Sequence, residues 1–149
     1  MSSSKFDLSV RYYIYKHFAE MGTAPTYEKI AEELNQPSER VLKSFINLNS
    51  HHMIFLEPGS VNIRMANPFS AIPTRYIVRS GNLQWWANCA WDSLGIAAAT
   101  HRDVVITAGF PDEGESIELT VENGVLDGKE TYVYFALPCD QWYDDLIYT

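Results

Sequence analysis

The sequence predicts an α+β protein, with a helical N-terminal part followed by a mainly antiparallel sheet. Two observations favour this class. Apolar residues recur at helical spacing in three stretches before residue 50, whereas runs of β-branched and aromatic residues, separated by turn dipeptides, follow residue 100. The chain has 149 residues, which is enough to bury a sizeable core in one compact unit or two.

The first helix is expected over residues 5–20. Phe6, Val10 and Phe18 lie at helical spacing there, and Gly22 follows as a stop signal. Within residues 24–56 the pattern predicts two shorter helices with a turn between them, and Ser38 is expected to cap the second. This arrangement is typical of a helix-turn-helix.

A hairpin is expected next, with short strands on either side of the Glu-Pro-Gly-Ser turn at residues 57–60. A hairpin directly after a helix-turn-helix indicates a winged helix. Residues 66–78 hold two prolines and end in a strand-like run, so we expect them to lead into a second unit. The predicted units are a winged-helix-like unit at 1–65 and an α+β unit at 66–149.

The second unit is expected to open with a helix over residues 82–101, which are rich in Ala and Leu and show helical periodicity. Strands are expected where β-branched and aromatic residues cluster or alternate, at 103–110, 116–124 and 130–137. The dipeptides Asn123-Gly124 and Asp127-Gly128 indicate turns between the last two strands. One short helix is expected after Pro138.

The composition disfavours several classes of protein. A formal charge of −8 and a pI near 4.8 argue against a nucleic-acid partner, because phosphate binding depends on clustered Lys and Arg. No run approaches the roughly 18 apolar residues of a membrane helix, and no secretory signal is visible near the first residue. We therefore expect a cytoplasmic protein whose two cysteines are free thiols.

Cys89 and Asp92 carry the candidate chemistry. If residues 84–98 form a helix, positions three apart lie on one face, and both side chains reach the same small ligand. A thiolate is a soft metal ligand and a strong nucleophile, and a carboxyl group beside it can carry a proton. The pair predicts cleavage of a metal–carbon bond. The alternative is that Cys89 is an ordinary core residue.

Aromatic residues flank this pair and allow two interpretations. Trp85, Trp86 and Trp91 are candidates for a pocket wall, although such clusters belong to the core more often. A zinc site is weakly supported, because the histidines lack zinc-ligand spacing. The four histidines are His17, His51, His52 and His101.

The stretch WWANCAWDSLGI at residues 85–96 resembles the Cys-x-x-Asp segment of the alkylmercury (organomercurial) lyase family. The connector NPFSAIPT and the later runs ITAGF, IELTV and YVYFAL follow in the family's order, so the resemblance extends over nearly the whole chain. It implies protonolysis of a carbon–mercury bond without a required cofactor, with mercury(II) as product or bound ion. By the same resemblance, Cys89 captures the organomercurial and Asp92 supplies the proton, and both are ligands of the metal.

The chain departs from the family at the second catalytic cysteine. The resemblance places that thiol at residues 129–132, Lys-Glu-Thr-Tyr, none of which is a cysteine. Cys139 follows Glu130 by nine residues, and a strand of that length spans roughly 20 Å or more, so Cys139 does not simply occupy the missing position. Glu130 would be a hard oxygen ligand in its place. The resemblance therefore indicates a divergent, short member, with Glu130 and Cys139 as possible pocket residues.

Three functions remain open at this point. The first is a lyase acting on a small organometallic or related soft electrophilic ligand. The second is a non-catalytic module that binds a soft metal or small ligand through Cys89, because one thiolate gives a stable mercury adduct that need not cleave. The third is a ligand-responsive winged-helix regulator, for which the sequence offers few candidate DNA contacts. These contacts are Arg40, Lys43, Asn47 and Asn49.

Overall fold

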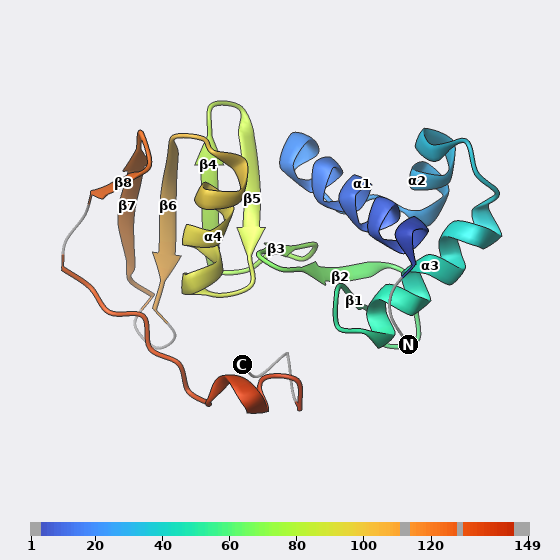
Figure 1. Ribbon diagram of the computed structural model, residues 1–149. Helices are drawn as coiled ribbons and strands as arrows, with labels where there is room; N and C mark the ends of the chain where they lie inside the picture. The colour runs from blue at the N-terminus through green and yellow to red at the C-terminus, as the bar shows by residue number, and fades with distance from the viewer. Residues whose placement is uncertain (1–3, 111–113, 128–129, 145–149) are drawn as a thin grey trace.

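The computed structural model describes residues 4–110, 114–127 and 130–144 of the chain. Helices dominate the first third, and strands with one further α-helix and a short 3-10 helix follow (Figure 1). The helices are α1 (Lys5–Met21), α2 (Tyr27–Leu34), α3 (Ser38–Ser50), α4 (Ala90–Thr100) and the short 3-10 helix η1 (Cys139–Gln141). The strands are β1 (Phe55–Leu56), β2 (Ile63–Ala66), β3 (Phe69–Ser70), β4 (Tyr76–Ser80), β5 (Leu83–Ala87), β6 (Val104–Gly109), β7 (Ser116–Glu122) and β8 (Val125–Asp127).

The strands form one sheet in the order β1-β2-β3-β5-β4-β6-β7-β8, and all neighbouring pairs are antiparallel. This confirms the predicted α+β class with a mainly antiparallel sheet. Helix α4 packs on β4, β5 and β6 (Figure 1). The sheet runs through the predicted division at residue 66, because β2 ends there and pairs with β3. The division into two units therefore stays a prediction.

The N-terminal helices form over the predicted residues, but the predicted cap of α3 is wrong: Ser38 is the first residue of that helix, and its N-cap is Pro37, which has no side-chain oxygen to accept a hydrogen bond. The side chain of Ser4 caps α1 by accepting from the Asp7 backbone N–H, and Gly22 ends the helix at φ 74°. The β1–β2 hairpin follows α3 in the predicted place. The winged-helix assignment itself stays a prediction. Within the described part of the chain, no helix combines the length and the apolar character needed to cross a membrane.

The core joins α1 to the sheet. The Trp85 side chain is fully buried, and its indole N–H donates to the carbonyl oxygen of Phe18 at 2.7 Å. The Phe18 ring stacks on Phe69 of β3, with 5.2 Å between the ring centroids. Strands β3 and β5 are thus fixed against α1. Only Asn88 and Cys89 separate the end of β5 from the start of α4.

Two predicted elements are wrong. Residues 83–87 form β5 and not the start of a helix, because they pair with β4 and alternate in burial, with Trp85 and Ala87 buried. Residues 130–137 form no strand, because no neighbouring strand pairs with them in the described part of the chain. Tyr132 and Tyr134 are 88% and 87% exposed there. The unpredicted strand β8 follows the Asn123-Gly124 turn, in which both residues have positive φ.

Candidate functional site

Cys89 and Asp92 lie together at the start of α4. Cys89 is the N-cap residue in extended conformation, with φ −147° and ψ 179°, and Asp92 is the third residue of the helix. The backbone N–H of Asp92 donates to Cys89 Sγ at 3.4 Å, and the two side chains lie close enough for each to shift the pKa of the other. The structure therefore brings the pair together, but through the geometry of a helix cap and not through a shared helix face.

Burial disfavours the charged form of both members of this pair. Partial burial raises the pKa of the Cys89 thiol above its ordinary value of 9.0, and the Asp92 carboxylate raises it further, although backbone N–H groups oppose both effects. Burial also raises the pKa of Asp92 above 3.8, while hydrogen bonds from Asn88 and Cys89 act in the opposite direction. A thiol beside a carboxyl group with a raised pKa can exchange a proton with it locally.

Asn88 is a member of the site that the sequence did not reveal. Its side-chain nitrogen lies 3.2 Å from Asp92 Oδ2 and 3.1 Å from Asn67 Oδ1. It also lies 3.3 Å from the carbonyl oxygens of Pro68 and Phe69. Asn67, Pro68 and Phe69 lie about twenty positions earlier in the chain, so no local pattern around Cys89 could have indicated the role of this amide.

The three tryptophans lie in different environments. Trp85 belongs to the core. Trp86 is half-buried on β5, opposite Ile77 of β4. Trp91 on α4 is 57% exposed, and its ring contacts Phe135 with 6.3 Å between centroids. Trp85 is thus a core residue, and a role in a pocket wall stays a prediction for Trp86 and Trp91.

The C-terminal candidates lie in the segment 130–144. Glu130 is exposed and accepts a hydrogen bond from the Tyr132 hydroxyl at 3.2 Å. Cys139 is exposed at the start of η1, and both cysteines are free thiols. Among the hydrogen bonds and ring contacts of the described residues, none joins Glu130 or Cys139 to Cys89 or Asp92. The segment touches α4 through Phe135 and Trp91.

Cys89 and Asp92 together offer two donors to a soft metal. Across residues 4–110, 114–127 and 130–144, no group of three or more His, Cys, Asp or Glu side chains could hold a metal ion. Two donors suit an ion such as mercury(II), which accepts few ligands and prefers sulfur.

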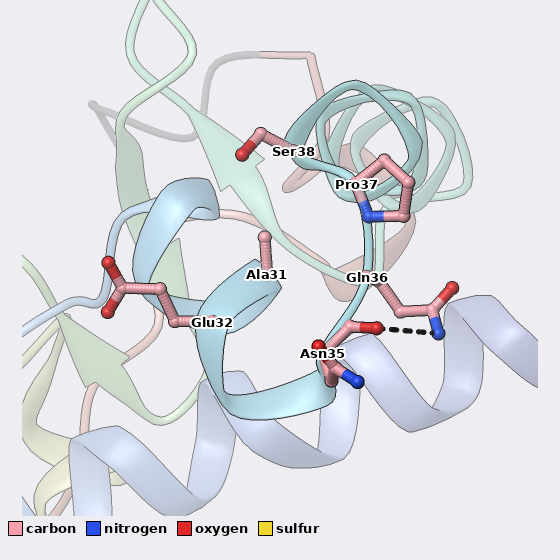
Figure 2. A pocket seen from close by; sticks show the side chains of 6 residues that line it. All are labelled: Ala31, Glu32, Asn35, Gln36, Pro37 and Ser38. Carbon is pink, nitrogen blue, oxygen red and sulfur yellow. Dashed lines mark hydrogen bonds between the residues drawn. The ribbon is translucent and has the colours of Figure 1, made fainter.

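A surface hollow of about 370 Å³ lies elsewhere, at the turn between α2 and α3 (Figure 2). Helix α1 separates it from α4 (Figure 1). It brings together neither a thiol nor a pair of acids. Its lining residues are Ala31, Glu32, Asn35, Gln36, Pro37 and Ser38.

Three of the four candidate DNA contacts on α3 and its flanks are used inside the protein. Asn47 donates to Asp7 Oδ2 at 2.8 Å, and Asn49 accepts from the backbone N–H of Leu56 at 2.9 Å. The Arg40 guanidinium lies over the Phe6 ring, 4.0 Å from its centroid. These side chains are held against the protein's own surface.

Comparisons with known proteins agree with the motif. The sequence profile of the alkylmercury lyase family (MerB) matches residues 69–148. The crystal structure of the mercury-bound form of MerB2 resembles this chain with a TM-score of 0.68 and 27% sequence identity, over 84% of this chain and 60% of that one. The chain thus spans about three fifths of the length of that relative. No curated protein sequence gives a significant match. Since the family profile covers more than half of its residues, the chain belongs to the alkylmercury lyase family.

Proposed function

We propose that the protein cleaves the carbon–mercury bond of an organomercurial by protonolysis, with Cys89 as nucleophile and Asp92 as proton donor. The juxtaposition of the Cys89 thiol and the Asp92 carboxyl group at the start of α4, where the Asp92 backbone N–H donates to the sulfur, carries this proposal. Membership of the alkylmercury lyase family and similarity to a mercury-bound relative support mercury as the metal. The steps need only the substrate and these two side chains, and so no cofactor.

In the first step the Cys89 sulfur attacks mercury. The incoming compound is R–Hg–X, in which X is a halide or a small thiolate. The sulfur–mercury bond forms, the mercury–X bond breaks, and the thiol proton moves to the ionised Asp92 carboxylate. This local transfer matters because burial raises the pKa of the Cys89 thiol and leaves little free thiolate.

In the second step Asp92 returns the proton. The O–H and carbon–mercury bonds break and a carbon–hydrogen bond forms, which releases R–H. The carboxylate that remains can take the vacated position on mercury, so that mercury(II) is held between Cys89 and Asp92. The raised pKa of Asp92 favours this step, because a proton held weakly by the carboxylate would be lost to solvent between the two steps.

A second candidate function is stoichiometric binding of a soft metal or organometallic ligand by Cys89. No hydrogen bond or ring contact of the described residues brings the second thiol, Cys139, to Cys89 or Asp92, and this favours binding without cleavage. Two thiolates would raise the electron density on mercury and weaken its carbon bond. One thiolate and one hard carboxylate donate less electron density to mercury and weaken its carbon bond less.

Arene release separates the two functions. Protein carrying Cys139→Ser, which removes the exposed thiol, is incubated with a phenylmercury salt under excess small thiol, and benzene is measured by gas chromatography. We expect benzene above the level of the Cys89→Ala, Cys139→Ser control. Benzene no higher than that control, together with one phenylmercury bound per protein, would leave the binding module and discard the lyase.

A further inference from the structure

The side chain of Asn88 connects the proposed proton donor to a distant turn. Its single amide nitrogen lies within 3.3 Å of four acceptors: Asp92 Oδ2, Asn67 Oδ1 and the carbonyl oxygens of Pro68 and Phe69. The nitrogen carries only two hydrogens. One of the four acceptors, Asp92, lies on α4, and the other three lie in the turn at residues 67–69. With its two hydrogens, the amide can therefore bond to Asp92 and to that turn at the same time.

The turn is a firm anchor. Phe69 is buried, stacks on Phe18 of α1 and pairs with Ala87 of β5. On the other side, Pro68 lies so close to α4 that a Cβ placed at Gly95 would be 3.1 Å from Pro68 Cβ. A side chain bonded to this turn is therefore bonded to the packed core.

Asp92 needs such an anchor. Its other side-chain partner is the Cys89 thiol, which is a weak donor and would lose its hydrogen as it binds a metal. The amide of Asn88 remains through such a change. From this geometry we infer that Asn88 is the positioning residue of the site: it fixes the Asp92 carboxyl group beside the sulfur while a bound group is cleaved. This inference rests on the proposed function.

The rotamer of Asp92 tests the inference without any activity. Three-bond couplings to the Asp92 β-protons and to Cγ, measured by NMR, report its χ1 angle. We expect one rotamer in the wild type and averaging between rotamers in Asn88→Ala. The matched control is Asn67→Ala, which removes another partner of Asn88 but keeps the bond to Asp92, so one rotamer should persist. If the alanine variant does not fold, Asn88→Ser has a side chain too short to reach both partners and should show the same averaging.

Kinetics give the second readout. With the phenylmercury salt, Asn88→Ala should reduce benzene release by about 10- to 100-fold, as misplacement of a reacting group does, while capture by Cys89 stays unchanged. An Asp92 that keeps one rotamer in the Asn88 variant overturns the inference, and so does averaging of equal extent in Asn67→Ala. A wild type that releases no benzene would end the proposed lyase function, but the rotamer comparison would still decide the role of Asn88.

Discussion

The start of α1 and the start of α4 have the same local design but different chemistry. Each helix has an N-cap side chain that accepts from the backbone N–H three residues later: Ser4 Oγ from Asp7 at 3.1 Å, and Cys89 Sγ from Asp92 at 3.4 Å. In each, the third residue is a buried or half-buried aspartate beside the cap side chain, and in α1 this aspartate also accepts hydrogen bonds from the cap residue. The Cys-x-x-Asp motif is thus a helix cap in which sulfur replaces a hydroxyl group.

The donors around each carboxylate explain the difference. Burial raises the pKa of Asp7, but bonds from Ser44, Ser4 and Asn47 together outweigh it, and the pKa lies below its ordinary value. Asp92 has only Asn88 and Cys89 as side-chain donors, and burial dominates. An aspartate with several hydrogen-bond donors keeps a low pKa even when it is buried, whereas an aspartate with few donors has its pKa raised by burial.

Replacing the cap residues should give the largest contrast. Cys89→Ser keeps a good helix cap but removes the sulfur, so we expect complete loss of mercury capture at this site with stability unchanged or slightly higher. Ser4→Ala should leave capture intact and lower the free energy of unfolding by about 1 kcal/mol. Mass spectrometry in a Cys139→Ser background measures capture, and urea unfolding measures stability. Capture by the serine variant would refute the role of Cys89.

Matched amide substitutions should give opposite effects on stability at neutral pH. Asp7→Asn replaces an acceptor with an amide that faces the donors of Ser44 and Asn47, and should lower the free energy of unfolding by about 2–3 kcal/mol. Asp92→Asn removes a carboxylate whose charge is disfavoured by burial, so stability should stay the same or rise by up to about 1 kcal/mol. An equal decrease in the free energy of unfolding of the two variants would mean that the two carboxylates stabilise the fold equally, and would contradict this expectation.

The pH dependence of these differences follows from the directions of the pKa shifts. The folded pKa of Asp7 is lowered, so its contribution is complete above the unfolded value, near 3.8, and is lost as the pH falls through the folded pKa. The folded pKa of Asp92 is raised, so its penalty appears as the pH rises from 3.8 through the folded pKa. Urea unfolding at several acidic pH values should therefore show the Asp7→Asn deficit shrinking and the Asp92→Asn gain vanishing.

Local pattern was sufficient to predict α1 and its stop at Gly22, because Val10, Ile14 and Phe18 form a periodic buried stripe. Local pattern failed to predict the secondary structure of segments whose conformation depends on pairing with another strand. The run around Trp85 is apolar at nearly every position, and only its register with β4 shows that it is a strand. Residues 130–137 show the reverse, since strand-forming residues there lack a partner strand in the described structure. The sequence paired Cys89 with Asp92, but the role of Asn88 depends on contacts that only the folded chain provides.

The C-terminal candidates should have the smallest effect. Glu130→Cys would restore a second thiol, and a gain in benzene release would be expected if residue 130 bordered the site. Because Glu130 is exposed and bonded to Tyr132, we expect no gain relative to the parent protein, and no loss in Cys139→Ser. Benzene release by the two variants measures both. A clear gain in Glu130→Cys would place this segment beside Cys89.

A single-turnover comparison of Asp92→Asn with the parent protein, both carrying Cys139→Ser, tests the proton transfer most directly. Each protein is loaded with one equivalent of phenylmercury, and bound phenylmercury and released benzene are followed together. The account predicts that both proteins capture the compound through Cys89, the Asp92→Asn variant by losing the thiol proton to solvent. Only the protein with Asp92 should then release benzene and retain mercury(II). Equal benzene release from the two proteins would contradict it, because the proton would then come from another donor.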